Sequence, residues 1–167
     1  YLNGCKNDEK GVLTVKGNIA LTKNGVLEDS TTDSQYCIGG ISGYKAAKGN
    51  IDTSNYGDVV IDVVWTSAED IKPILQVGGF TGRNHNTQAA SCKQYGDVYF
   101  KGNSQNFHGV TCLGGSTGSY IYKSEGRNND GNIYVSGTHG LMYIGGISGY
   151  VHRYKENALL TNAVNNG

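Results

Sequence analysis

Residues 38–44 read IGGISGY, and the pentapeptide Gly-Gly-x-(Ser/Thr)-Gly within them recurs three more times along the chain. Successive copies lie 39, 36 and 31 residues apart, and an aliphatic residue precedes each pair of glycines. Periods of about 20 to 50 residues are typical of solenoid proteins, in which each repeat forms one coil. We therefore expect a structural role for the paired glycines, which are Gly39, Gly40, Gly78, Gly79, Gly114, Gly115, Gly145 and Gly146.

A second block starts 17 or 18 residues after the first glycine of a pair and reads Gly-(Asp/Asn)-(Val/Ile)-x-(Ile/Phe/Val). Its copies begin at Gly57, Gly96 and Gly131, and their alternation of apolar and polar residues is typical of a half-buried β-strand. A third, weaker segment occurs at 49–54, 90–93 and 159–162. We predict an all-β protein, a right-handed parallel β-helix (β-solenoid) of about four rungs, each with three short strands.

The whole chain, 1–167, is predicted to be a single β-solenoid segment with repeats at approximately 1–36, 37–73, 74–109, 110–140 and 141–167. Because it begins and ends inside a repeat, we expect a fragment of a longer chain that continues into further repeats or caps. Residues 155–160 could instead form a short capping helix, although the repeat register after them favours a strand. The residues expected in the core are Val59, Ile61, Val98, Phe100, Ile133, Val135, Ile38, Val77, Leu113 and Ile144.

Side-chain amides stand two residues before each block glycine, at Asn55, Gln94 and Asn129. Amides that stack from coil to coil can hydrogen-bond along the stack, so the spacing predicts an amide ladder. The preference of turns for asparagine is the alternative explanation. Glycine at the same position of every coil would let successive backbones pack closely where the chain turns.

Composition excludes several classes of partner. The 14 basic and 14 acidic residues cancel, so no overall field attracts nucleic acid or anionic lipid. No apolar run approaches the roughly 20 residues that span a bilayer, and we expect no membrane insertion. The 26 glycines and single proline favour short strands joined by turns over a helical bundle. We also expect no cofactor.

The copies IGGISGY at 38–44 and 144–150, with VGGFTGR and LGGSTGS between them, resemble the GLUG-type repeat. That repeat is found in large bacterial surface proteins, including adhesins, immunoglobulin A peptidases and surface proteins of gut Bacteroidetes. The resemblance covers most of the chain, from about residue 35 onward. It implies a non-enzymatic segment, extracellular or at the cell surface, that is adhesin-like or a structural stalk. A glycan or a host surface protein would be the partner.

Two other functions are left open by the residues. The first is a glycan-binding or glycan-cleaving β-helix, and the second is a segment like those of phage fibres. Aromatic rings on a flat solenoid face can stack on sugar rings or anchor a protein. We predict ligand binding at Tyr44 and Tyr150, which follow equivalent pentapeptides, and at Tyr99 and Tyr134, which are outward positions of the second block. Such rings can equally pack against their neighbours on adjacent coils.

Two pairs of polar residues occupy equivalent positions in successive repeats. His108 and His139 each precede a glycine pair by six residues, so they would stack and could chelate a divalent ion. A lysine, Lys72, at the same position of an earlier repeat argues against such a metal site. Asp58 and Asp97 could bind calcium or act on a glycan, although turn chemistry alone accounts for both.

The four cysteines show no spacing typical of a zinc site. Cys37 and Cys112 share a position but are predicted to lie two coils apart, which is too far for a disulfide. Cys5 and Cys92 are also equivalent positions on separate coils. We expect free, mostly packed thiols, with disulfides across the coil open if the protein is exported.

Overall fold

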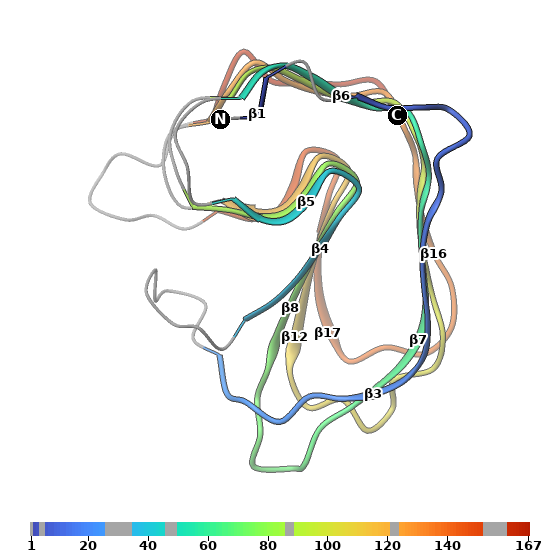
Figure 1. Cartoon of the computed structure of the whole chain (residues 1–167). Helices are drawn as coiled ribbons and strands as arrows, with labels where there is room; N and C mark the ends of the chain where they lie inside the picture. Colours follow the sequence, from blue (N-terminus) through green and yellow to red (C-terminus); the bar gives the residue numbers. More distant parts are fainter. Residues whose placement is uncertain are drawn as a thin grey trace.

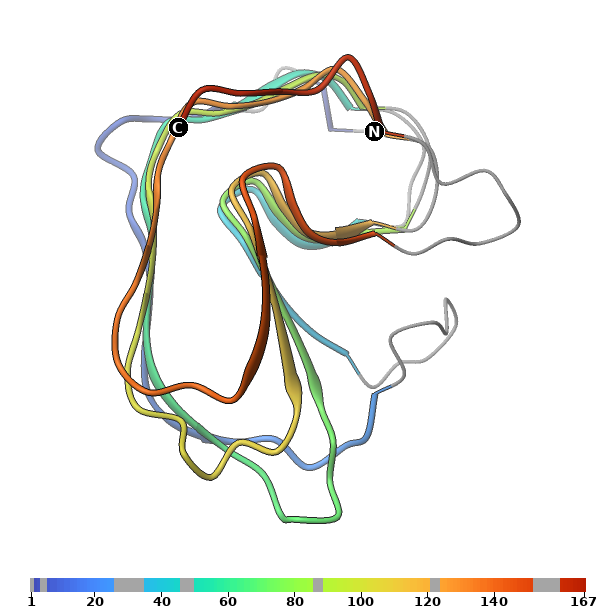
Figure 2. The same ribbon diagram turned by 180° about the vertical axis from the view of Figure 1, so that it is seen from behind.

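The computed structural model shows a chain that winds repeatedly around one axis, with equivalent segments of successive repeats lying over each other (Figure 1). The chain runs clockwise in Figure 1 as it recedes from the viewer, and Figure 2 shows the same stack from the far end, so the solenoid is right-handed. The predicted all-β parallel solenoid is confirmed. The structure describes residues 2–3, 6–25, 35–45, 50–85, 89–120, 124–151 and 160–167.

Four parallel sheets, A to D, run along the solenoid axis, and a two-stranded sheet E lies beside them. Sheet A contains β1 (Leu2–Asn3), β2 (Lys6–Asn7), β6 (Asn50–Asn55), β10 (Ala89–Gln94), β15 (Arg127–Asn129) and β20 (Val164–Asn165). Sheet B contains β3 (Leu13–Ala20), β7 (Val59–Thr66), β11 (Val98–Lys101) and β16 (Ile133–Val135). Sheet C contains β4 (Gln35–Gly39), β8 (Ile74–Gly78), β12 (Val110–Gly114) and β17 (Leu141–Gly145). Sheet D contains β5 (Ser42–Lys45), β9 (Thr81–Asn84), β13 (Thr117–Tyr120) and β18 (Ser148–Val151), and sheet E contains β14 (Ser124–Glu125) and β19 (Leu160–Thr161).

Each coil passes through sheets A, B, C and D in turn, so it has four main strands where three were predicted. The extra strand arises because the chain turns within the pentapeptide: β8 ends at Gly78 and β9 begins at Thr81. The described residues form coil 1 (2–45), coil 2 (50–85), coil 3 (89–120) and coil 4 (124–151), and 160–167 begin a fifth. Residues 155–159 lie outside the described residues, and the two that follow them form β19.

The paired glycines form an inward corner between sheets C and D, which is visible above the label β4 in Figure 1. Gly78 pairs in register with Gly39 on one side and Gly114 on the other, so the corner repeats on every coil. A Cβ at Gly79 would lie 2.5 Å from the Cδ of Gln94, a distance that real Cβ atoms do not adopt. Only glycine lets the corner approach the amide side chains of sheet A this closely.

The corner separates a large apolar core from a small polar compartment. Sheets B and C face each other across the large core, where Val59, Ile61, Val98 and Leu113 are completely buried. The small compartment contains Phe80 and Cys92 together with buried polar side chains, among them Arg127, Ser116, Thr53 and Tyr120. The repeated apolar positions therefore form only one of the two compartments.

Coil 4 buries its apolar residues less completely than coils 2 and 3. Val135 is 40% exposed and Ile144 is 52% exposed, although their equivalents Phe100 and Leu113 on coil 3 are buried. Strands β16 and β17 are the last members of sheets B and C in the described part of the chain. These two residues were expected in the core, and they are exposed because no further strand of those sheets covers them in the part of the chain that the structure describes.

The described segments contain no helix that is long and apolar enough to cross a membrane.

Candidate functional site

The amides predicted to form a ladder lie in one column at the ends of β6, β10 and β15. The Nδ2 of Asn55 donates to the Oε1 of Gln94 on the next coil at 3.0 Å and to the carbonyl oxygen of Gly79 at 2.8 Å. Each amide of the column also donates to the carbonyl oxygen two residues further along the chain. The column thus joins adjacent coils and holds the glycine corner from the inside.

The ladder is interrupted after Gln94. Asn7 donates to Asn55 at 2.7 Å and Asn129 donates to Asn165 at 2.9 Å, so asparagine reaches asparagine across one coil. The side chain of Gln94 is one methylene longer, and its Nε2 donates to the carbonyl of Gly96. The Oδ1 of Asn129 is consequently buried and accepts no hydrogen bond.

A column of carboxylates runs parallel to the amides on the outer surface. The Oδ1 of Asp58 accepts a hydrogen bond from the backbone N–H of Asp97 at 2.8 Å. The Oδ1 of Asp97 in turn accepts from the backbone N–H of Asn132 at 2.8 Å and from its Nδ2 at 3.3 Å. Each aspartate therefore satisfies a backbone donor of the next coil, as turn chemistry demands.

Tyr99 and Tyr134 stack on each other over the outer face of sheet B. Their ring centroids are 4.9 Å apart and their planes differ by 11°. The hydroxyl of Tyr99 donates to the Oδ2 of Asp97 at 3.1 Å, and this hydrogen bond raises the pKa of Tyr99. The Nζ of Lys101 lies 5.3 Å from the centre of the Tyr99 ring. The faces of the two rings are thus largely turned toward each other, while Tyr134 remains 48% exposed.

The sequence analysis did not identify a second stacked pair, Tyr56 and Tyr95. Their centroids are 4.4 Å apart at 10°, and the Nζ of Lys6 lies 4.5 Å above the Tyr56 ring. The two tyrosines directly follow Asn55 and Gln94, so the alignment of the amide positions contained the signal. The Tyr56–Tyr95 stack therefore joins coils 2 and 3, and the Tyr99–Tyr134 stack joins coils 3 and 4.

Tyr44 and Tyr150, the other two predicted ligand-binding residues, lie on sheet D at opposite ends of the stack. Tyr44 is 49% exposed; its ring stacks on His85 at 6.1 Å, and the guanidinium of Arg83 lies 5.6 Å from its centre. Burial and the charge of Arg83 lower the pKa of His85. Tyr150 packs at 5.7 Å against the ring of Tyr143. The structure does not bring the four predicted tyrosines into one site.

His108 and His139 precede residues that pair in register, as the spacing indicated, but their side chains have separate environments. The Nε2 of His139 is 2.9 Å from the carbonyl oxygen of Ser136, its Nδ1 is buried, and its ring packs on Phe100. In this conformation neither nitrogen of His139 is open to an ion shared with His108. Among the described residues no three His, Cys, Asp or Glu side chains form a group that could hold a metal ion.

Three of the cysteines, Cys37, Cys92 and Cys112, are free thiols, and Cys5 lies outside the described residues. Cys37 and Cys112 flank Gln76 in register on sheet C. Burial raises the pKa of Cys37 to about 11 and that of Cys112 to about 12, so both are protonated at neutral pH. Neither has the thiolate character that a reactive cysteine needs.

Arg127 is a completely buried cation that the repeat does not predict. Its equivalents on the preceding coils are Cys92 and Thr53. One terminal nitrogen of Arg127 donates to the Oγ of Ser116 at 3.3 Å, and the guanidinium lies 5.6 Å from the centre of the Phe80 ring. Its pKa is lowered by burial. No sequence signal marks this residue, because the position changes its residue type on every coil.

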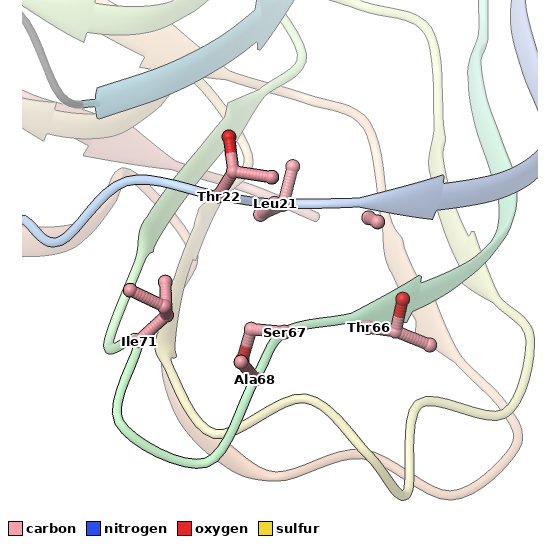
Figure 3. Close-up of a pocket in the computed structure, with 7 residues that line it drawn as sticks. Leu21, Thr22, Thr66, Ser67, Ala68 and Ile71 are labelled. Carbon is pink, nitrogen blue, oxygen red and sulfur yellow. The ribbon is translucent and has the colours of Figure 1, made fainter.

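An open cavity of about 440 Å³ lies between coils 1 and 2, beyond the end of sheet B (Figure 3). Figure 3 shows the segment of Leu21 and Thr22 on one side and the loop from Thr66 to Ile71 on the other. None of the lining residues is titratable, so the cavity offers no acid, base or charged ligand for catalysis. The lining residues are Ala20, Leu21, Thr22, Thr66, Ser67, Ala68 and Ile71.

Comparison with known proteins finds no match to any family model, curated protein or solved structure.

Proposed function

We propose that this chain is a non-enzymatic repeat segment of a bacterial cell-surface protein, as the resemblance to the GLUG-type repeat implies, and that it acts as a spacer or adhesin-like stalk. One observation supports this most: the polar and glycine residues that recur are engaged in contacts between coils. Asn55 bonds to the next coil, Asp58 bonds to the next coil, and Gly79 packs against it. The recurring residues thus specify how one coil stacks on the next, and coils stacked in this way form an elongated structure.

The outward positions vary where the inward ones repeat, which is the pattern expected of a scaffold. Thr14, Val60, Tyr99 and Tyr134 occupy one column on the outer face of sheet B. A catalytic site needs groups whose protons or charges are available to a substrate. Asp58 and Asp97, the two acids whose positions could suit glycan cleavage, each accept a hydrogen bond from a backbone N–H of the next coil.

Cell-surface location is tested with antibodies raised against the segment. They should label intact cells that produce the protein, and brief protease treatment of intact cells should remove the signal. Labelling that requires broken cells would contradict the proposal. An antibody against a cytoplasmic protein of the same cells serves as the control for leakage.

Glycan binding is the second candidate, favoured by the exposed rings of Tyr44 and Tyr134. A glycan array probed with the purified segment should give signals that Tyr44→Ala or Tyr134→Ala reduces, because sugar rings stack on aromatic faces. Val64→Ala, at an exposed aliphatic residue of sheet B, is the matched control. Binding that all three variants retain would exclude these tyrosines, and no binding at all would favour the spacer.

A further inference from the structure

The stacked tyrosines on sheet B have a geometry that suits oxidation. Tyr99 and Tyr134 pair in register on coils 3 and 4, with nearly parallel rings 4.9 Å apart between centroids. Both rings reach solvent, since Tyr134 is 48% exposed and Tyr99 is only partly buried. The hydroxyl of Tyr99 already donates to a carboxylate oxygen of Asp97 at 3.1 Å.

We propose that Tyr99 and Tyr134 are a site of oxidative cross-linking, where a haem peroxidase with hydrogen peroxide joins the two rings as dityrosine. The bond would tie coil 4, where Val135 and Ile144 are exposed, to coil 3, where the equivalent residues are buried. Such a link would strengthen a surface stalk and so rests on the proposed function for its biological use. The geometry that favours the link belongs to the chain, whereas the peroxidase and the hydrogen peroxide are supplied from outside.

Asp97 is placed to accept the proton that Tyr99 releases when it loses an electron. A phenol is oxidised readily only when its proton leaves with the electron, so a base within hydrogen-bond reach promotes the step. The Oδ2 of Asp97 accepts the hydroxyl proton of Tyr99, while its Oδ1 is held by the N–H and Nδ2 of Asn132. The ammonium of Lys101 near the ring opposes loss of an electron alone, which makes this proton transfer more important.

The atoms and electrons balance as follows. Tyr99 passes one electron to the oxidised haem and its hydroxyl proton to Asp97, and Tyr134 passes one electron to the haem and its proton to water. The two neutral radicals form a carbon–carbon bond between ring positions ortho to the hydroxyls. The hydrogens on those two carbons then move to the oxygens and restore both phenols. One molecule of hydrogen peroxide is reduced to two molecules of water.

The pair Tyr56 and Tyr95 provides an internal comparison. These rings are stacked more closely, at 4.4 Å and 10°, and also have a lysine ammonium beside them. Neither hydroxyl has a carboxylate acceptor in the described part of the chain. If Asp97 is decisive, the Tyr99–Tyr134 link should form before a Tyr56–Tyr95 link. If stacking alone were sufficient, the closer pair would react first.

The experiment treats the purified, folded protein at low micromolar concentration with a haem peroxidase and limiting hydrogen peroxide. Dityrosine fluorescence gives the rate, and tandem mass spectrometry of tryptic peptides locates the link. We expect a monomeric product linked between residues 99 and 134, which Tyr99→Phe and Tyr134→Phe each abolish. Asp97→Asn keeps the acceptor for Asn132 and should slow the link about tenfold, the effect of roughly 1.4 kcal/mol on a barrier.

Asp58→Asn is the matched control, because Asp58 occupies the same position one coil earlier and accepts no hydrogen bond from Tyr99, so this change should slow the link far less than Asp97→Asn does. The fluorescence of Trp65, the single tryptophan, verifies that each variant is folded. Three results would overturn the proposal: a product linked only between molecules, equal linkage of the other tyrosines, or an Asp97→Asn rate equal to that of Asp58→Asn. Each of these leaves the cell-labelling test of the proposed function unaffected.

Discussion

The second glycine of each pair lies where the fold leaves no room for a side chain. A Cβ at Gly79 would meet the amide of Gln94 and the carbonyl of Gly115, which belong to the neighbouring coil. We expect Gly79→Ala to lower the free energy of unfolding by about 3 kcal/mol, because the coils must separate to accept it. Urea denaturation followed by Trp65 fluorescence measures this. Gly140→Ala, where a Cβ meets a single backbone oxygen in an exposed loop, should cost about 1 kcal/mol or less.

The interrupted amide ladder offers a change that should stabilise the protein. Gln94→Asn would place an asparagine between Asn55 and Asn129, the spacing that works elsewhere in the column. We expect a gain of about 1 kcal/mol as the buried Oδ1 of Asn129 acquires a donor. The reverse change, Asn55→Gln, should destabilise the protein, because the longer side chain crowds the corner at Gly40. Equal stabilities of the two variants in urea would contradict this account.

At the scale of the element, two thiols of sheet C make stability depend on pH: Cys37, which is partly buried, and Cys112, which is buried. Cys37 and Cys112 have pKa values of about 11 and about 12 in the fold, against an ordinary value of 9.0. Above about pH 9 the unfolded chain therefore loses thiol protons that the folded chain keeps, and stability falls as pH rises. Each thiol should account for roughly 2 kcal/mol by about pH 11.

This pH dependence is measured as the urea midpoint between about pH 8 and pH 10.5 in the wild type and in Cys37→Ala/Cys112→Ala. Removing both thiols should flatten the decline, although the variant will start less stable because one buried and one partly buried side chain are shortened. Tyrosines and lysines titrate in both proteins and cancel in the comparison. Parallel curves would mean that the thiols are not protected by burial.

How far the elements were predictable depends on whether a residue recurs. Stacking forces the same residue types onto equivalent positions, so the glycine pairs and the strand beginning at Val59 could be placed from spacing alone. The four-strand coil could not be predicted from the sequence. The pentapeptide reads as a single turn, and nothing in its short sequence shows that one strand ends at its first glycine and another begins three residues later. Arg127, and the contact between Gln76 on coil 2 and Ser119 on coil 3, use residue types that the equivalent positions of the other coils lack, so a repeat cannot predict them.

At the scale of the whole molecule, stability is expected to be uneven along the axis. Coils 2 and 3 each have a neighbour on both sides, and Val59 and Val98 are completely buried there. Among the described strands, those of coil 4 in sheets B and C pair with coil 3 alone, and Ile144 of coil 4 is 52% exposed. In a repeat protein each coil is stabilised by its own contacts and by those with its neighbours, so a coil with one covered face opens more often.

Hydrogen exchange followed by mass spectrometry tests this gradient. Peptides from β7 and β11 should exchange slowest, and peptides from β16 and β17 should exchange about tenfold faster or more, the ratio that roughly 1.4 kcal/mol of local stability produces. Uniform protection would show that all four coils unfold as one unit. In that case the stacked backbone bonds between coils 3 and 4, and not the burial of apolar side chains, would set the stability of the end of the stack.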